Sequence, residues 1–530
     1  MPPHDRLPNI LLITSDQQHW RTLGSNNPAI KTPALDRLAS LGVRFDRAYC
    51  CNPTCTPTRA SIITGMYPSA HGAYTLGTKL PETVPTLGQY LHAAGYHTSL
   101  IGKAHFQPLR STPDCPSVEA YPTLRDLDFW RSFNERQTPW YGFDHVELAR
   151  NHGDEGHVGQ HYALWLEAQG LKDWREYFQP PHDGSEPEFR PRFAPSVRNG
   201  PGYGWRERMH WQLPEHLHYT AWTGQRTIAM IEESAARGQP FFCWSSYHDP
   251  HPPYCVPEPW ASLYDPAAME DQIGAFVPGE FDHMPPPHRL TRGDDNRPFA
   301  PFNEDGRGNH GYHSHQHDRR KLRAACAIYY GMISFMDHWI GRTLDALERC
   351  GQLDRTLIIF TTDHGHFLGQ HGLVAKGPFH YEDMVRVPFI AALGRRLPPG
   401  RVSNQLVSLV DLAPTFLETA GLPTPLQMQG RGRLAQWADP QGPGPTAILV
   451  ENHHNGSQVH LRTLVTQRWK LTLYRGRDWG ELFDLEADPS ELHNRFDDPA
   501  YAATRAEMTE QMVQADLQRE PAPQPRVWGA

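Results

Sequence analysis

The sequence contains no Cys-x-x-Cys pair, although it has eight cysteines. Zinc-ribbon and thioredoxin-like sites need that spacing, so both classes of site are excluded. The chain also has no apolar run long enough to cross a membrane, and no secretory signal precedes the strand-like segment Asn9–Thr14. We therefore expect a cytoplasmic protein with reduced thiols and no membrane partner.

The chain also lacks an excess of positive charge, because 59 acidic residues outnumber 50 lysines and arginines and the net charge is −9 at pH 7. Such a chain has no overall basic field that would attract nucleic acid or anionic lipid. We therefore expect no nucleic-acid partner. An anionic substrate would have to be held by local lysine, arginine and histidine side chains against a repulsive background.

Hydrophobic residues make up 38% of the 530 residues, which is enough for a globular core in a chain too long for one compact domain. Short apolar runs alternate with helix-like segments through most of the sequence. This alternation is typical of an α/β sandwich with a largely parallel sheet between helices. The predicted strands are Asn9–Thr14, Thr98–Ile101, Phe241–Ser245 and Thr356–Thr361, and the predicted helices are Thr32–Gly42, Pro85–Ala94 and Ala327–Leu347.

The pattern changes after Thr446. Three segments there look like antiparallel strands, and Tyr501–Leu517 has helical spacing of its apolar residues. We predict a large domain over residues 1–440 and a small C-terminal α+β domain with a short antiparallel sheet over 441–530. Two long polar insertions, near 107–214 and 254–319, are expected over the edge of the main sheet, where they would shape substrate access.

The segment Cys55–Arg59, with the sequence Cys-Thr-Pro-Thr-Arg, predicts a cysteine at the entrance of a helix. A threonine on either side of the cysteine can cap this helix, and Pro57 suits its first turn. Unpaired N–H groups and the helix dipole would stabilise an anion beside Cys55, and Arg59 adds a permanent positive charge. The alternative is an ordinary helix N-terminus with a buried thiol.

Polar side chains follow four of the predicted strands at the point where each strand ends. Ligands of open α/β sheets bind at the carboxyl ends of the strands, so we expect these side chains to lie close together. They are Asp16 and Gln17 after the first strand, Lys103 and His105 after the second, His251 after the third, and Asp363 and His364 after the fourth.

Asp16, Gln17, Asp363 and His364 form an oxygen-rich set with one imidazole. Such a set suits one hard divalent cation, with Ca²⁺ favoured and Mn²⁺ or Mg²⁺ as alternatives. Zinc would normally require more nitrogen or sulfur ligands. Taken singly, Asp16 could instead cap a turn and Asp363 could pair with an arginine.

The segment Gly95–Lys103 has a superficial likeness to a phosphate-binding loop. Its glycine spacing is wrong for a Walker motif, and Ala104 stands where such a loop has its magnesium-binding serine or threonine. A nucleotide triphosphatase is therefore excluded.

Several sequence motifs, in the order in which they occur along the chain, together resemble those of the type I, formylglycine-dependent sulfatases of the alkaline phosphatase superfamily. The resemblance covers the chain from Asn9 to about Gly421, and Glu481–Pro489 is similar to the C-terminal domain of that family. The elements are Cys55–Arg59 as Cys-x-Pro-x-Arg, Gly95–Lys103 followed by His105, Tyr247–Pro253 as a His-Pro-Pro segment, Thr362–Gly365, and Gly369–Pro378 with Lys376.

The resemblance implies an alkaline-phosphatase-like fold and a sulfuric ester hydrolase, with residues 1–440 as the catalytic domain. It implies that a formylglycine-generating enzyme oxidises Cys55 to formylglycine, whose hydrate attacks a sulfate ester of a sugar or small molecule. The cation would bind position 55 together with Asp16, Gln17, Asp363 and His364. By the same resemblance, Asp363 would act as base and Arg59 would hold the hydrate. Lys103 and Lys376 would neutralise sulfate oxygens, and His251 or Lys376 would protonate the leaving group. His105 would take the proton whose loss releases sulfate.

Two positions depart from the common pattern of this family, because Gln17 replaces an aspartate and His364 replaces an asparagine. Related phosphonate monoester and choline-sulfate hydrolases share both substitutions, so a phosphonate monoester or phosphodiester hydrolase is the alternative function. Lys103 together with His105 favours the sulfatase. A further hypothesis is a non-catalytic binding protein in which Cys55 stays a thiol. An oligomer is compatible with the sequence.

Overall fold

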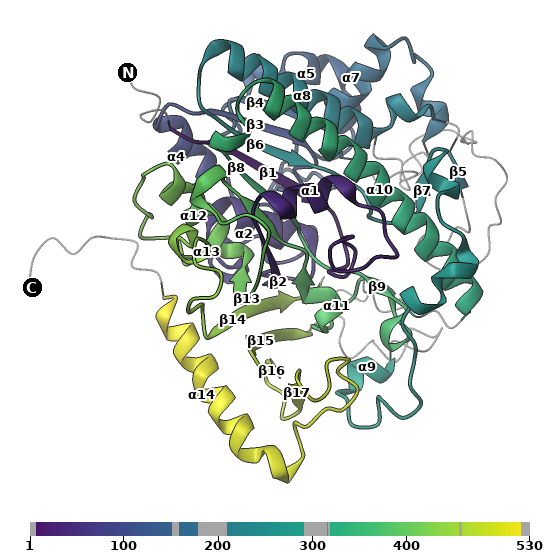
Figure 1. Ribbon diagram of the computed structural model, residues 1–530, viewed down its shortest axis with the longest axis vertical. Helices are drawn as coiled ribbons and strands as arrows, with labels where there is room; N and C mark the ends of the chain where they lie inside the picture. Colours follow the sequence, from purple (N-terminus) through teal and green to yellow (C-terminus); the bar gives the residue numbers. More distant parts are fainter. Residues whose placement is uncertain are drawn as a thin grey trace, which may run out of the picture.

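The computed structural model describes residues 7–150, 158–178, 209–211, 213–290, 315, 318–454 and 458–520. Within these residues, a nine-stranded sheet lies between two layers of helices, and a four-stranded sheet stands at one end of the molecule (Figure 1). The strands of the large sheet are β1 (Asn9–Ser15), β2 (Val43–Tyr49), β3 (His97–Gly102), β4 (His145–Leu148), β6 (Phe241–Ser246), β8 (Thr356–Thr362), β11 (Arg386–Val387), β12 (Ile390–Ala392) and β13 (Arg401–Ser408).

The large sheet is mostly parallel, as the sequence predicts. Its order is β11–β2–β12–β8–β1–β6–β3–β4, and β13 pairs with β2. The five strands from β8 to β4 run parallel, as do β2 and β13, whereas β11 and β12 are antiparallel to β2. In a parallel sheet of this kind, the helices that connect the strands cover both faces of the sheet.

The central strand β1 shows why both faces are buried. Ile10 and Leu12 pack into one core, whereas Leu11 and Ile13 pack into the other. Because side chains alternate along a strand, an unbroken apolar run supplies both faces. One face is covered by α1 (Pro33–Leu41), α8 (Tyr219–Arg237) and α10 (Arg319–Arg349), and the other by α2 (Cys55–Thr64), α4 (Leu87–Ala93) and α12 (Leu412–Thr419).

A threonine followed by a proline, as at Thr32 and Pro33, predicts a helix that begins with a threonine cap, and α1 begins at this point. Thr32 stands at the N-cap position, but its side chain makes no capping hydrogen bond. Instead, Asp337 of α10 accepts hydrogen bonds from the backbone N–H groups of Ala34 at 3.0 Å and Leu35 at 2.8 Å. The expected threonine cap is therefore wrong, because the buried contact between two helices supplies a carboxylate to the same N–H groups.

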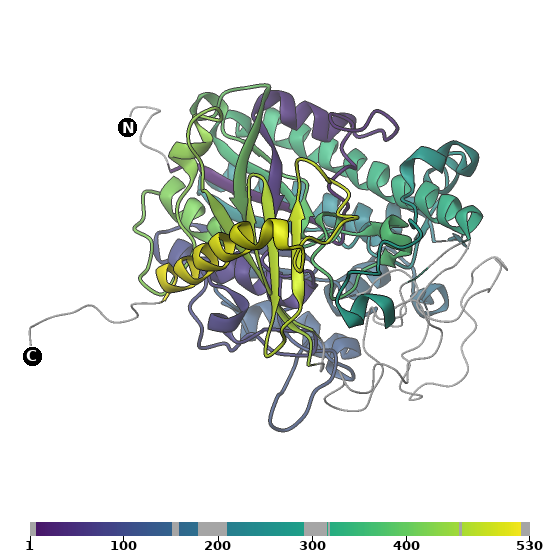
Figure 2. The ribbon, with the colours of Figure 1, turned by 90° about the horizontal axis from the view of Figure 1, so that it is seen from below.

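The C-terminal sheet consists of four antiparallel strands in sequence order, with one long helix packed across it (Figure 2). Lys470 of this sheet is buried and lies 3.3 Å from Glu382 of α11 (Glu382–Val385), so an ion pair joins this sheet to the part of the chain that forms the large sheet. The antiparallel sheet and its helix confirm the α+β fold class predicted for the C-terminal segment. The elements are β14 (Ala447–His453), β15 (His460–Thr466), β16 (Trp469–Tyr474), β17 (Gly480–Asp484) and α14 (Ala502–Gln518).

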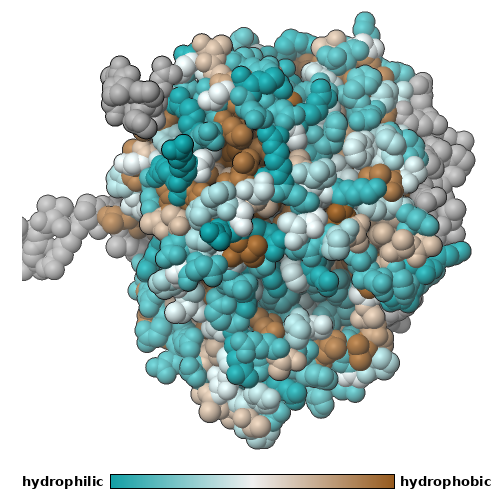
Figure 3. Space-filling view, in the orientation of Figure 1, coloured by the Kyte–Doolittle hydropathy of each residue, from teal (hydrophilic) through white to brown (hydrophobic). Residues whose placement is uncertain are grey.

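The described parts of the two polar insertions contain short elements, and the first also contributes β4 to the edge of the large sheet. Among the described helices, none combines the length and apolar character that crossing a bilayer requires. On the face seen in Figure 3, hydrophobic residues form small separate areas among hydrophilic ones. The remaining short elements are α3 (Pro68–His71), α5 (Leu127–Arg131), α6 (Phe133–Arg136), α7 (Gln160–Ala168), α9 (Pro286–Leu290), α13 (Leu434–Trp437), β5 (Met209–His210), β7 (Cys255–Val256), β9 (Phe367–Leu368) and β10 (Val374–Ala375).

Candidate active site

The residues predicted from the strand ends do lie together. Strands β8, β1, β6 and β3 are neighbours, and Thr14 near the end of β1 pairs with Thr361 on one side and Ser246 on the other. The four strands therefore end level with one another, and the loops that follow them share one edge of the sheet (Figure 1).

Cys55 is the first residue of α2, and the whole helix is buried. The preceding Thr54 makes no capping bond with its side chain, since its hydroxyl donates to Asn52 at 2.5 Å instead. The Cys55 Sγ lies 3.2 Å from Nε2 of His364 and 3.6 Å from Oδ1 of Asp16. The thiol thus faces the residues that follow β1 and β8.

A buried group of possible metal ligands surrounds this thiol. Ligand atoms of Asp16, Cys55, Asp363 and His364 all lie within 4.8 Å of one another. Gln17 is adjacent, and its backbone N–H donates to Oδ1 of Asp363 at 3.0 Å. Its Oε1 is buried without a hydrogen-bond partner in the described structure. Two carboxylates, one imidazole and an unpartnered amide oxygen fit a hard divalent cation.

Arg59 lies one turn further along α2 and is completely buried. Its Nε donates to Oδ2 of Asp363 at 2.9 Å. Asp363 therefore pairs with an arginine, as the alternative interpretation of the sequence allowed, and also belongs to the group of possible metal ligands. Its Nη1 donates to Oγ of Ser246 at 2.7 Å, whereas its Nη2 has no hydrogen-bond partner and lies 3.8 Å from Oδ2 of Asp16. Burial favours loss of the charge, but Asp363 and Asp16 outweigh burial and raise the pKa of Arg59.

Two lysines bring positive charge to the site. Lys103 Nζ contacts Oδ2 of Asp16, and Lys376 Nζ lies 3.4 Å from Sγ of Cys55. Burial alone would raise the pKa of Asp16, but the positive charges of Lys103, Arg59 and Lys376 lower it well below its ordinary range. Burial opposes the charge of Lys376 as well, yet Cys55 and Asp16 raise its pKa. The site therefore holds buried ionised groups of both signs.

The nearby thiol and imidazoles are shifted toward their neutral forms. Burial, followed by the charge of Asp16, raises the pKa of Cys55 to about 11. Burial lowers the pKa of His364 to about 4. His251 Nε2 lies 3.1 Å from Nζ of Lys376, and burial together with that lysine holds the pKa of His251 well below its ordinary value.

His105 lies on a loop that a buried carboxylate holds in place. Backbone N–H groups of His105, Phe106 and Gln107 donate to Glu119 at 2.9, 2.9 and 3.0 Å. Arg150 pairs with the same carboxylate at 2.7 Å. The φ angle of His105 is +58°, and its buried Nδ1 has no hydrogen-bond partner in the described structure. Sequence reasoning missed Glu119 and Arg150, which belong to no motif.

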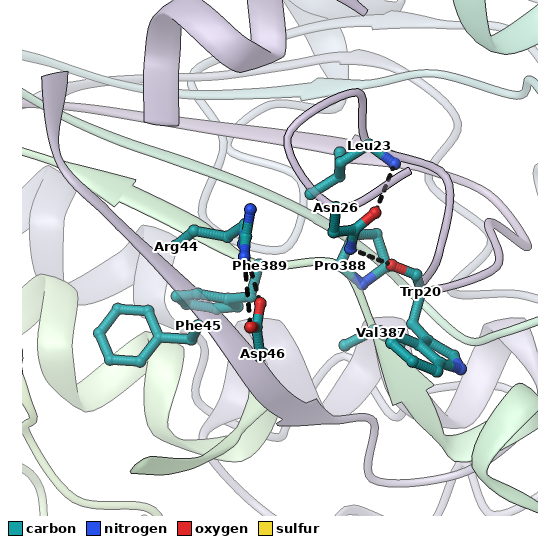
Figure 4. A pocket seen from close by; sticks show the side chains of 9 residues that line it. All are labelled: Trp20, Leu23, Asn26, Arg44, Phe45, Asp46, Val387, Pro388 and Phe389. Carbon is teal, nitrogen blue, oxygen red and sulfur yellow. Dashed lines mark hydrogen bonds and ion pairs between the residues drawn. The ribbon is translucent and has the colours of Figure 1, made fainter. Parts of the chain in front are cut away.

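A separate small pocket lies between the loop after β1 and strands β2 and β11 (Figure 4). Its polar side chains mostly bond one another, since Arg44 pairs with Asp46 at 2.8 Å and Asn26 bonds the backbone of Trp20 and Leu23. None of its lining residues is among the predicted site residues.

The comparison with known families agrees with this geometry. The chain matches the sequence profile described as Sulfatase over residues 8–422, and the profile described as N-sulphoglucosamine sulphohydrolase, C-terminal, over residues 369–518. The chain therefore belongs to the sulfatase family, which confirms the resemblance seen in the sequence.

Individual relatives cover nearly the whole chain. An uncharacterized sulfatase of Escherichia coli strain K12, YidJ, is 28% identical over 514 residues, which are 96% of this chain and 86% of the relative. An arylsulfatase of Clostridium perfringens is 28% identical and covers 93% of this chain and 91% of its own length. The solved phosphonate monoester hydrolase from Silicibacter pomeroyi shares the fold, with a TM-score of 0.75, 24% identity and coverage of 97% and 96%.

Proposed function

We propose that this chain hydrolyses a sulfate monoester of a sugar or another small molecule, with the residue at position 55 as the nucleophile. The observation that carries this proposal is the set of groups around the Cys55 Sγ. His364, Asp16 and Lys376 all approach it within 3.6 Å, at the N-terminus of a helix. The family membership of the chain supports the same reaction.

A divalent cation is part of the proposal, with Ca²⁺ favoured and Mn²⁺ or Mg²⁺ as alternatives. When bound, it would supply positive charge to the sulfate group and lower the pKa of the attacking hydroxyl. The oxygen-rich donor set and the unpartnered Oε1 of Gln17 support this choice over zinc. The residues that would hold the cation are Asp16, Gln17, Asp363 and His364, together with position 55.

The nucleophile is proposed to be formylglycine, made from Cys55 by a formylglycine-generating enzyme. Its hydrate would supply one hydroxyl for attack on sulfur and a second hydroxyl whose deprotonation expels sulfate and restores the aldehyde. An unmodified cysteine or a serine would instead stop at a stable covalent ester. Catalytic turnover therefore depends on a side chain with two hydroxyl groups.

Arg59 and Asp363 are proposed to orient this side chain. Arg59 is fixed by its bonds to Asp363 and Ser246, so its unpartnered Nη2 is available to a hydroxyl at position 55. Asp363 accepts the Arg59 bond at Oδ2, and we assign it the role of base toward the attacking hydroxyl.

The other positive groups are proposed to serve the sulfate and the leaving oxygen. Lys376 and Lys103 would neutralise sulfate oxygens, which lowers the barrier most in a buried site. His251 or Lys376, which lie 3.1 Å apart, would give the proton that the departing alkoxide needs as its bond to sulfur breaks. His105, with Nδ1 unpartnered, would take the proton whose loss releases sulfate.

Hydrolysis of a phosphonate monoester or phosphodiester is the second candidate. It is supported by the structural likeness to the phosphonate monoester hydrolase from Silicibacter pomeroyi and by Gln17 and His364. A tetrahedral phosphorus anion has the shape and charge that this site would also accept. A binding protein with an unmodified Cys55 is the third candidate, and a complete set of acid, base and cation ligands argues against it.

Two measurements on the purified protein separate these candidates. We expect turnover of an aryl sulfate to exceed turnover of an aryl phosphonate monoester under the same conditions, and the reverse order would favour the second candidate. Peptide mass analysis should find the aldehyde in place of the thiol at Cys55. An unmodified thiol in protein that turns over neither ester would refute both hydrolase proposals.

A further inference from the structure

Gln17 differs from the carboxylate ligands in one chemical respect. A carboxylate presents oxygen on both sides, whereas a carboxamide presents oxygen on one side and N–H on the other. The Nε2 of Gln17 lies 2.9 Å from Nδ1 of His366, and Gln17 Oε1 is buried without a hydrogen-bond partner. Because Nε2 can only donate, Nδ1 of His366 is the acceptor, and Oε1 points away from His366.

The orientation of His366 is itself determined by its surroundings. Its ring is fully buried and stacks on Tyr329, with centroids 4.6 Å apart and an interplanar angle of 12°. Its Nε2 lies 2.8 Å from the hydroxyl of Tyr254. A ring proton on Nε2, donated to that hydroxyl, leaves Nδ1 as the acceptor that Gln17 Nε2 requires.

The backbone of Gln17 is fixed as well. Tyr329 donates its hydroxyl hydrogen to the Gln17 carbonyl at 2.9 Å and accepts from the His19 N–H at 2.8 Å. Asp363 accepts the Gln17 N–H at 3.0 Å. The φ angle of Gln17 is +62°, so a non-glycine residue is held in the left-handed region. With the backbone fixed, the main remaining choice is which end of the carboxamide faces the site.

We propose that His366 is a positioning residue that makes Gln17 present oxygen, rather than N–H, to the divalent cation. Without this acceptor, a turn of the carboxamide would direct two N–H donors at the cation. A chain with aspartate at position 17 would need no such partner. The inference rests on the cation site of the proposed function and concerns which residue makes that site effective.

The test is a double-mutant cycle read by cation affinity and not by activity. The full-length wild type and the variants His366→Phe, Gln17→Asp and the double variant are stripped with a chelator and titrated with Ca²⁺ by calorimetry. Phenylalanine keeps the ring that stacks on Tyr329 but removes the acceptor. We expect His366→Phe to weaken Ca²⁺ binding about 10- to 100-fold when Gln17 is present. With aspartate at position 17, the same change should alter affinity by less than about threefold.

His288→Phe is the matched control. His288 is also buried, stacks on Phe379 at 3.9 Å and lies 3.1 Å from the hydroxyl of Tyr381. It also pairs with the buried carboxylate of Glu481 at 3.1 Å, and none of these partners is a proposed cation ligand. It should lower the melting temperature without weakening Ca²⁺ binding. If His366→Phe does not fold, Tyr254→Phe replaces it. That variant frees the His366 tautomer and should also weaken Ca²⁺ binding.

The outcomes distinguish the two proposals. A wild type that binds none of Ca²⁺, Mn²⁺ and Mg²⁺ would refute the cation site of the proposed function. A wild type that binds Ca²⁺ tightly, with unchanged affinity in His366→Phe, would overturn the role of His366 alone. An equal loss of affinity with glutamine and with aspartate at position 17 would overturn it too, because the effect would then not depend on the carboxamide.

Discussion

Glu119 provides the sharpest test of how the site is held together. Its carboxylate is buried, accepts three successive backbone N–H groups from the loop after β3 and pairs with Arg150. Successive N–H groups of this kind form a concave anion site, and here the anion is a side chain of the same protein. The loop carries His105 at one end of the bonded segment and follows Lys103. Glu119 should therefore determine where both side chains lie.

The change Glu119→Gln keeps the shape of the side chain but removes its charge and one acceptor. The amide NH₂ group would face one or more backbone N–H groups, and Arg150 would be left buried beside a neutral group. Removing one partner of a buried ion pair costs about 3–5 kcal/mol of folding stability. A shift of the loop by about 1 Å reduces turnover about 100-fold when it displaces catalytic groups. We expect the loss in kcat to exceed any change in KM.

The assay is steady-state turnover of an aryl sulfate together with thermal unfolding. Glu147→Gln is the matched control, because Glu147 is a largely buried carboxylate that receives two hydrogen bonds from Arg226, at 2.7 and 2.9 Å, and has no contact with the site. Both variants should lose stability, but only Glu119→Gln should lose turnover by about two orders of magnitude. Equal turnover in the two variants would refute the positioning role of Glu119.

Three further outcomes follow from the same contacts. Cys55→Ser should abolish turnover and accumulate sulfated protein, detectable by intact mass, and full turnover by this variant would exclude the proposed nucleophile. Removal of the divalent cation by a chelator should lower the melting temperature, since a ligand present at 100 times its Kd adds about 2.7 kcal/mol of stability, and an unchanged melting temperature would contradict the cation site. Burial opposes the charge of Glu147, but hydrogen bonds from His145 and Arg226 outweigh it and lower the pKa of Glu147 to about 2. Because this folded-state pKa lies below the ordinary 4.5, the ionised carboxylate stabilises the fold fully above pH 4.5, and this stabilisation is lost as the pH falls toward 2. Glu147→Gln should therefore flatten the pH dependence of the unfolding free energy between pH 5 and 3.

The sequence predicts both the parallel sheet and the common edge at which the loops after its strands lie, and the reason is physical. The apolar runs of β1 and β8 can be buried only in a sheet covered on both faces, and parallel strands bring their carboxyl ends together. The sequence alone therefore predicts that Asp16 and Asp363 belong to one site. The capping of α1 could not be predicted, because Asp337 reaches it across a helix contact that no local pattern encodes.

Sequence reasoning missed Glu119, Arg150, Tyr329 and His366. All four hold predicted site residues in position, and this shared role explains why they were missed. Seven non-glycine residues with positive φ occur in the described structure, and Gln17, His105 and Ala375 are among them. The first two belong to the proposed site, and Ala375 directly precedes Lys376. Such backbone strain costs about 1–3 kcal/mol per residue and persists only where surrounding groups enforce it. At Gln17 the surrounding groups come from α10 and the loop after β8, and at His105 they come from Glu119 and Arg150. Because these groups act on backbone atoms and on ring faces, they leave no spacing or motif in the sequence, and the loops where they act are the ones that carry the chemistry.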